Sequence, residues 1–351
     1  MRANEKLIIR QRIVIYNVNW LGDVLFSTAV IRNIRFNYPA SYIACIIPPR
    51  CLPVLEGNPY LNEIIVFDEK GVHKGIGGKI SFIRALRQKR FDSAFLLHRS
   101  LTRAFIVWAA GIRERIGYTS AKRGFLLTQK IRPLDARRAH RIDYYLGVIK
   151  GAGLVVKNRH TDFFFSEQDR QAVENLLRQN SIYARDVIIG LNPGGNWDPK
   201  RWQPESFAFL ADRLAGEYAA RVIFTGSPED RELVSRIQSL MKSPSVSTCG
   251  VLSLKQFAAL CGRMSVFISA DSGPLHIANA AGARRIVALF GPTDPQLTGP
   301  VPADRVAIIQ KNTGCPIPCY TVDCRDNRCM KAITVDDVLA AVRPGANATS
   351  S

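Results

Sequence analysis

Four short segments combine glycine with charged or hydroxyl-bearing residues, and each directly follows an apolar run that predicts a buried strand. In the first segment, Gly22 and Asp23 follow the apolar run 12–18. Gly22 would let a ligand approach the backbone closely, because glycine has no Cβ. Asp23 is either the N-cap of the helix that begins here or a functional carboxylate, and spacing alone leaves both interpretations open.

The second segment, 192–202, contains two glycines, among them Gly194, and the basic pair Lys200-Arg201. Exposed backbone N–H groups beside a cation are typical of a phosphate cradle. The segment is not a P-loop, because Lys200 does not stand in a Gly-Lys-Ser/Thr sequence. The alternative is a long loop with a solvated basic pair and a packed Trp202.

The third segment places Ser227, Pro228, Glu229 and Asp230 after the apolar run 221–225. A hydroxyl residue followed by proline and two acidic residues is typical of a helix start. An acidic residue at this place can also hold the ribose hydroxyls of a nucleotide. The sequence leaves both interpretations open, and it does not say which carboxylate would contact the ribose.

The fourth segment gives the strongest signal, because a strand ends at two small residues and Asp271, Ser272 and Gly273 open a helix. Backbone N–H groups at such a helix start can bind a diphosphate without a metal ion. His276 would lie in the first turn of that helix, close to the anion. We therefore predict a diphosphate site here, although a lone histidine is more often structural.

Apolar runs alternate with amphipathic helical stretches, which predicts parallel sheets with helices on both faces. The strands expected are 12–18, 41–47, 63–67, 92–97, 186–191, 221–225, 265–268 and 284–290. The helices expected are 24–37, 79–90, 101–110, 167–179, 204–218, 228–240, 254–261 and 274–281. The pattern weakens between 113 and 157. We expect an α/β protein of two doubly wound domains, 1–165 and 166–351, with a ligand cleft between them.

Charge is divided unequally along the 351 residues, whose formal net charge is +19. Residues 1–160 hold 28 Lys/Arg and 10 Asp/Glu, whereas residues 161–351 hold 20 and 19. The first half should therefore face something anionic, such as nucleic acid, a membrane surface or a phosphorylated substrate. No apolar run reaches the ~20 residues that cross a bilayer, and Arg10 and Arg12 interrupt any signal-peptide core. We expect a cytoplasmic protein that can touch a membrane surface without crossing it.

Taken together, the motifs resemble those of glycosyltransferase family 9, whose best-known members are the ADP-heptose:lipopolysaccharide heptosyltransferases. The matching segments occur in the family's order along almost the whole chain. They are Leu21–Thr28, Leu191–Gly194, Lys200–Trp202, Asp271–His276, Phe290–Pro295, Thr298–Pro300, the cysteine cluster 315–329 and Ile333–Val338. The stretch 195–199 varies within the family and is not carried over.

The resemblance implies a GT-B fold, with an acceptor-binding domain at 1–165 and a nucleotide-sugar-binding domain at 166–351. It implies that Asp23 is the catalytic base of an inverting transfer. Lys200 would offset the charge that grows on the departing diphosphate. The substrate-binding residues would be Gly22, Gly194, Asp271, Ser272, Gly273, His276 and either Glu229 or Asp230.

The resemblance also implies the partners: a nucleotide sugar (ADP-heptose), a lipopolysaccharide inner-core acceptor and an anionic inner-membrane surface. No Asp-x-Asp pair is present, so we expect a reaction without metal or cofactor. Three alternatives remain: another nucleotide sugar, a relative that binds nucleotide sugar without turnover, and a basic nucleic-acid-binding protein. The last lacks a recognisable nucleic-acid-binding module, so we expect no nucleic acid as partner.

Two further features carry hypotheses of their own. Cys315, Cys319, Cys324 and Cys329 could be reduced thiols, a structural zinc site or disulfides, in that order of preference. The basic helix expected at 79–90 has Ile80, Ile83 and Leu86 at helical spacing, which predicts that they pack on the sheet. Its outward cations are either solvated or contact anionic lipid.

Overall fold

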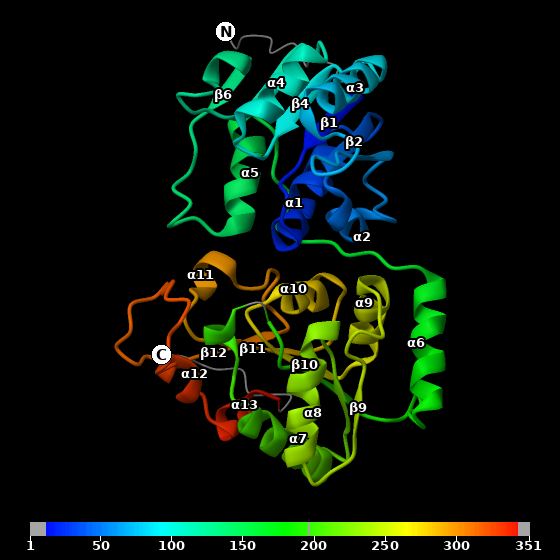
Figure 1. The fold of residues 1–351 in the computed structure, drawn as a ribbon, viewed down its shortest axis with the longest axis vertical. Coiled ribbons are helices and arrows are strands. Elements are labelled where there is room, and N and C mark those ends of the chain that lie inside the picture. The colour runs from blue at the N-terminus through cyan, green and yellow to red at the C-terminus, as the bar shows by residue number, and fades with distance from the viewer. Residues whose placement is uncertain (1–11, 196, 343–351) are drawn as a thin grey trace. The chain divides into compact units, whose positions relative to one another are not determined.

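The computed structural model describes residues 12–195 and 197–342. The chain divides into two compact units, Met1–Asp162 and Phe163–Ser351 (Figure 1). The boundary expected after residue 165 lies close to this division. Each unit is built around one sheet of six strands, and every strand pair in both sheets is parallel.

The sheet of the first unit has the strand order β3-β2-β1-β4-β5-β6. Its strands are β1 (Arg12–Tyr16), β2 (Tyr42–Ile47), β3 (Glu63–Val66), β4 (Ser93–Leu96), β5 (Glu114–Tyr118) and β6 (Gln129–Ile131). The order reverses between β1 and β4, which are neighbours in the sheet. In open α/β sheets, the carboxyl ends of the strands at such a switch point form the ligand crevice.

Helices cover both faces of this sheet. They are α1 (Leu21–Asn37), α2 (Leu52–Leu55), α3 (Gly75–Gln88), α4 (Leu101–Ala109) and α5 (Arg141–Gly151), with the short 3-10 turns η1 (Pro49–Cys51) and η2 (Gly124–Leu126). Val14 and Tyr16 point into a core that α3 and α4 close. Their neighbours Ile13 and Ile15 point to the opposite face. There α1 packs against α5 (Figure 1).

The second unit repeats this topology with the order β12-β11-β10-β7-β8-β9. Its strands are β7 (Ile188–Asn192), β8 (Arg221–Phe224), β9 (Ser245–Ser247), β10 (Val266–Ala270), β11 (Ile286–Phe290) and β12 (Val306–Gln310). If β7 to β12 are counted as first to sixth, the order read from the β9 edge is 3-2-1-4-5-6, the same as in the first unit. The switch point therefore lies between β7 and β10.

The helices of the second unit also form two layers. They are α6 (Glu167–Gln179), α7 (Pro204–Tyr218), α8 (Arg231–Leu240), α9 (Leu254–Arg263), α10 (Gly273–Ala280), α11 (Pro295–Thr298), α12 (Arg328–Lys331) and α13 (Val335–Val342), with η3 (Asp198–Lys200) and η4 (Pro228–Asp230). One core cluster joins the sheet to α7, α8, α12 and α13. On the other face, Phe257 of α9 contacts Phe267 of β10, with ring centroids 5.6 Å apart.

The α/β alternation expected from the sequence is confirmed, and so are most expected elements. Local patterns in the sequence did not predict the strands β5, β6, β9 and β12 or the helices α2, α5, α11, α12 and α13. All four strands lie at or next to a sheet edge. β5 is partly polar, and β6 and β9 have three residues each, so these three lack the apolar run that marks a buried strand. Across the described part of the chain, no helix combines the length and apolar character needed to cross a membrane.

Candidate active site

Asp23 lies in the first turn of α1, after the carboxyl end of β1. The helix begins at Leu21 and its N-cap is Trp20, so the interpretation of Asp23 as N-cap is wrong. The Oη atom of Tyr145, from α5, donates a hydrogen bond of 2.8 Å to Oδ1 of Asp23. The carboxylate is half-buried, and it is held from across the α1–α5 contact rather than by its own helix.

Tyr145 is the functional candidate that sequence reasoning missed. Burial raises the pKa of Tyr145, and the neighbouring Asp23 carboxylate raises it further. Tyr145 therefore remains a protonated donor at neutral pH and orients Asp23. Tyr145 is 122 residues from Asp23 in the sequence. It lies in the stretch where the sequence showed no clear helical pattern, so no local pattern predicted that the two side chains would meet.

Gly22 has open space beside it. A Cβ built at this position would meet no atom of the described residues within 4 Å. No internal packing contact therefore demands glycine here. This is what we expect where a ligand rather than a side chain comes close to the backbone.

A cavity of about 230 Å³ opens at the carboxyl ends of β1, β2 and β3 in the same unit. Its wall includes Asn19, Arg50 and Arg103. Arg103 is buried, with its guanidinium 3.6 Å from Glu69 and over the ring of Tyr16 at 5.6 Å. The cavity lies at the edge of the sheet from which α1 and Asp23 begin, and its wall holds three cations and the two carboxylates of Asp68 and Glu69.

In the second unit, Lys200, Asp271 and His276 form one cluster. The Nζ atom of Lys200 donates to Oδ2 of Asp271 at 2.8 Å and to its backbone oxygen at 3.2 Å. The Nε2 atom of His276 lies 3.4 Å from Oδ1 of Asp271. The switch point between β7 and β10 brings these residues together, because Lys200 follows β7 and the other two follow β10.

The positive charge of Lys200 is paired with the negative charge of Asp271 inside the second unit. Burial alone would raise the pKa of Asp271, but the hydrogen bond and charge of His276 and then those of Lys200 outweigh it, so the pKa lies below its usual range. Asp271 is therefore ionised at neutral pH and fixes Lys200, whose side chain is 24% exposed. A lysine held in this way is ready to meet an anion without first being ordered.

The start of α10 lies beside this cluster. Ser272 is the N-cap and Gly273 the first residue of the helix, and Ser272 Oγ lies 3.2 Å from Ser269 Oγ. A Cβ built on Gly273 would meet no described atom within 4 Å. The helix start is thus open on the side where a side chain would otherwise stand, as a diphosphate requires.

Gly194 and Asp230 come together on the other side of β7. A Cβ on Gly194 would overlap the Asp230 carboxylate. That carboxylate accepts hydrogen bonds of 2.8 Å from the backbone N and from Oγ of Ser227, which forms a capping box. The capping interpretation of Ser227 and Asp230 is therefore confirmed. Glu229 is exposed next to it, and a hydrogen bond from Ser227 lowers the pKa of its carboxyl.

The described side chains at the end of the loop 192–202 make hydrogen bonds and packing contacts within the protein instead of extending into solvent. Arg201 donates to the backbone oxygen of Gly195 at 2.6 and 2.9 Å. The indole of Trp202 is buried and donates to the backbone oxygen of Ile333 at 2.9 Å. The Nζ atom of Lys200 lies 5.4 Å from the ring centroid of Trp197. The expected packing of Trp202 is confirmed, whereas the idea of a solvated basic pair is wrong.

The cysteine cluster and the basic helix give two further outcomes. All eight cysteines are free thiols, so the structure contains no disulfide among Cys315–Cys329. Within the described ranges, no three His, Cys, Asp or Glu side chains stand together as metal ligands.

On α3, Leu86 is buried and Ile83 half-buried as expected, but Ile80 is 43% exposed and Phe82 is buried instead. The prediction for Ile80 is wrong because the inward face of the helix is turned toward Phe82.

Comparison with known proteins supplies the family. The model of glycosyltransferase family 9 (heptosyltransferase) matches residues 79–327. The chain is 29% identical over 315 residues to lipopolysaccharide heptosyltransferase 2 of Escherichia coli K12, covering 86% of this chain and 89% of the relative. It is 28% identical over 308 residues to lipooligosaccharide heptosyltransferase 2 of Haemophilus influenzae, covering 85% and 88%.

Solved structures agree over both units. The family 9 glycosyltransferase of Veillonella parvula superposes with a TM-score of 0.85 at 26% identity, covering 95% of this chain and 97% of that one. The E. coli ADP-heptose LPS heptosyltransferase II superposes with a TM-score of 0.77 at 26% identity, covering 94% and 97%. The chain therefore belongs to glycosyltransferase family 9 and is a glycosyltransferase of the GT-B fold.

Proposed function

We propose that this enzyme transfers heptose from ADP-heptose to the inner core of lipopolysaccharide. The observation that carries the proposal is similarity to lipopolysaccharide heptosyltransferase 2 over 86% of this chain. The contacts of Lys200 with Asp271 at the β7–β10 switch point support a site for a sugar diphosphate. The surplus of cations in the first half, 28 against 10 acidic residues, suits a phosphorylated acceptor at an anionic membrane surface and needs no nucleic acid.

In this reaction, the acceptor hydroxyl gives its proton to the carboxylate of Asp23 as its oxygen attacks the anomeric carbon. The bond from that carbon to the ADP oxygen breaks, and ADP leaves with the electron pair. Attack from the side opposite ADP inverts the anomeric configuration. Tyr145 is a positioning residue, because its hydrogen bond of 2.8 Å fixes one oxygen of Asp23.

Lys200 and the start of α10 at Ser272 and Gly273 would offset the charge that develops on the leaving diphosphate. Asp271 holds Lys200 and His276 in place, so we assign it a positioning role within the substrate-binding set. Gly194 and Asp230 shape the loop beside the nucleotide, and the exposed Glu229 is the carboxylate better placed for the ribose, since the Asp230 carboxylate is occupied by the capping box.

The test is a transfer assay with inner-core lipopolysaccharide as acceptor, read by mass spectrometry as the addition of one heptose and by release of ADP. We expect ADP-heptose to be used in preference to ADP-glucose and UDP-glucose, with a chelator leaving the rate unchanged. Equal use of UDP-glucose, or no transfer from ADP-heptose, would contradict the proposal. Thermal stabilisation by each nucleotide sugar gives an independent measure of donor choice.

A further inference from the structure

The outer face of α4 carries an apolar ridge formed by Leu101, Phe105 and Trp108. Their side chains are 45%, 46% and 49% exposed. The spacing of four and then three residues puts all three on one side of the helix. The rings of Phe105 and Trp108 lie 5.5 Å apart. The inward residues Ala104 and Val107 are buried in the core, so the ridge is additional to what the fold itself needs.

Two elements that pack against α4 expose further apolar side chains. α3 packs against α4 and exposes Ile76 and Ile80. η2 also packs against α4 and exposes Phe125. Single exposed apolar residues are ordinary on protein surfaces, but a group with two aromatic rings on one helix face indicates an interaction surface.

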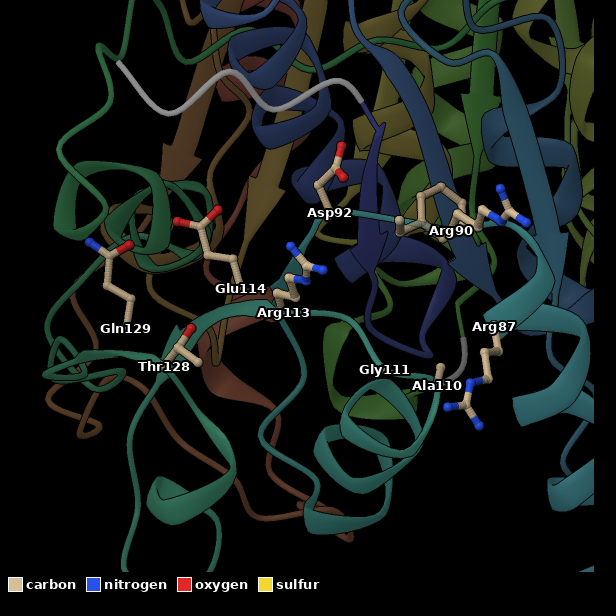
Figure 2. Close-up of a pocket in the computed structure, with 10 residues that line it drawn as sticks. Arg87, Arg90, Asp92, Ala110, Gly111, Arg113, Glu114, Thr128 and Gln129 are labelled. Carbon is tan, nitrogen blue, oxygen red and sulfur yellow. The ribbon is translucent and has the colours of Figure 1, made fainter. Parts of the chain in front are cut away.

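The part of the chain that forms α3, α4 and their neighbouring strands is rich in cations. Residues 71–130 hold 13 Lys/Arg and only two acidic residues, Asp92 and Glu114. A groove of about 840 Å³ lies where α3 and α4 end, at the amino edge of the sheet, and Arg87 and Arg113 line it beside Gly111 (Figure 2). Both acidic residues line the same groove, where Asp92 also accepts a hydrogen bond of 2.8 Å from the backbone N of Arg12. Arg103 and Arg123 are buried, and the remaining eleven cations still outnumber the two carboxylates in this part of the chain.

An apolar ridge in a cation-rich part of the surface fits an anionic lipid bilayer better than a second copy of the chain. Aromatic and aliphatic side chains flanked by cations are the features of a surface that lies in the headgroup region of an anionic bilayer. A second copy of the chain would bring two cationic surfaces together, and their repulsion would oppose pairing. Charge complementarity thus selects anionic lipid.

We infer that the apolar ridge of α4, with the cations of α3 and of the groove, docks this enzyme onto an anionic lipid bilayer. The inference deepens the proposed function and rests on it, because a lipid-anchored acceptor must be reached at the bilayer surface. α4 starts after the carboxyl end of β4, the neighbour of β1. Arg103, on the inward side of α4, lines the cavity of about 230 Å³. One helix therefore contacts lipid on its outer face and the candidate acceptor cavity on its inner face.

Co-sedimentation with vesicles tests the inference on the full-length protein. One vesicle preparation contains phosphatidylcholine and phosphatidylglycerol in equal parts, and the other contains phosphatidylcholine alone. We expect binding to the anionic vesicles only. Phe105→Ser together with Trp108→Ser should weaken that binding about tenfold or more, because the buried apolar area is lost. Arg87→Gln and Arg113→Gln should each weaken it about fivefold, the attraction of an anionic surface for one nearby cation.

The matched control is Phe209→Ser, which removes a 55% exposed aromatic ring from α7 of the second unit and should leave vesicle binding unchanged. Circular dichroism and transfer to a water-soluble, delipidated acceptor should match the wild type in all variants. If the wild type transfers heptose to that acceptor but ignores anionic vesicles, the docking inference is wrong and the proposed function stands. If the wild type binds anionic vesicles through the ridge but transfers no heptose, the docking surface is supported and the proposed function is wrong.

Sedimentation velocity tests the other possible occupant of the ridge, which is a second copy of this chain. If the double substitution converts a dimer into a monomer and leaves vesicle binding unchanged, the ridge is a self-association interface and the inference is overturned. Equal binding of the wild type to both vesicle preparations would likewise remove the role of the cations.

Discussion

The two units share one strand order but differ in their balance of basic and acidic residues. In the first, 28 Lys/Arg stand against 10 Asp/Glu within residues 1–160. Its candidate site holds Asp23 with a neutral tyrosine. In the second, basic and acidic residues nearly cancel, and the site lysine is already paired with Asp271 at 2.8 Å. The same topology therefore presents surplus cations in one unit and a balanced, preoriented cluster in the other.

In this enzyme, strand order determines where the candidate sites lie, and charge bears on which ligands they can bind. The strand order places both candidate sites at a switch point, β1–β4 and β7–β10. Under the proposed function, the cationic first unit would meet a large anionic acceptor or surface, and the second unit a compact diphosphate. Substitutions in each unit can challenge or refine this contrast.

The largest effect is expected at Asp23. Asp23→Asn keeps the shape of the side chain but removes the proton acceptor, so kcat should fall by about 10²–10⁴-fold. ADP affinity should be unchanged, because Asp23 belongs to the first unit. Rates with saturating donor, together with calorimetric binding of ADP, measure both quantities. Near-normal turnover of a folded Asp23→Asn protein would remove Asp23 as the base.

Tyr145→Phe is the matched companion of that variant. It deletes one hydrogen bond to Asp23 and leaves the carboxylate in place, so kcat should fall by much less than in Asp23→Asn. The Tm of Tyr145→Phe and its affinity for ADP should match the wild type, because the variant changes only how the Asp23 carboxylate is held. A fall in Tm with kcat unchanged would show that Tyr145 only supports the fold.

Lys200→Ala should come next. It removes the cation that would meet the diphosphate and should lower kcat/KM by about 10²-fold, the usual cost of losing one preorganised charge-stabilising donor. Arg201→Ala is the control, since Arg201 donates to the backbone of Gly195. If both variants lose the same activity, the loop as a whole matters and Lys200 has no special role.

Gly194→Ala should affect stability by a smaller amount. The added methyl group would displace the Asp230 carboxylate from Ser227 and break the capping box. Loss of a cap costs about 1 kcal/mol, which lowers Tm by about 2–4 °C in a domain of this size. Gly195→Ala is the matched control, because open space surrounds that position. Equal Tm values for the two variants would contradict the packing argument.

A pH dependence of stability is also expected in the first unit. Burial, together with the charges of Arg103 and Arg123, lowers the pKa of His98 from 6.5 to about 4. The Nδ1 atom accepts a hydrogen bond of 3.0 Å from the backbone N of Ser100, which protonation would break. Between pH 6.5 and 4 the unfolded chain binds more protons at this site, so stability should fall as the pH falls through this window.

Thermal unfolding at several pH values checks this expectation. His98→Gln should flatten the decline in Tm on acidification, whereas His160→Gln, at an exposed position, should retain it. The same decline in wild type and His98→Gln would assign the acid sensitivity to other groups.

Much of the fold followed from local pattern, because buried parallel strands are continuous apolar runs with turn residues at their ends. The candidate site residues were predictable for the same reason, since each follows a strand: Asp23 after β1, Lys200 after β7 and Asp271 after β10. Their partners were not. Tyr145 is 122 residues from Asp23 and Lys200 is 71 residues from Asp271, and such pairs depend on helix packing and strand order that no local window contains.

The separation of donor binding from proton abstraction can be measured by hydrogen–deuterium exchange with and without ADP-heptose, in the absence of acceptor. We predict protection in the second unit, in the segments 193–200 and 271–276, with little change at 19–25 of the first unit. Protection concentrated at 19–25, with none in the two segments of the second unit, would contradict the proposed roles of the two units.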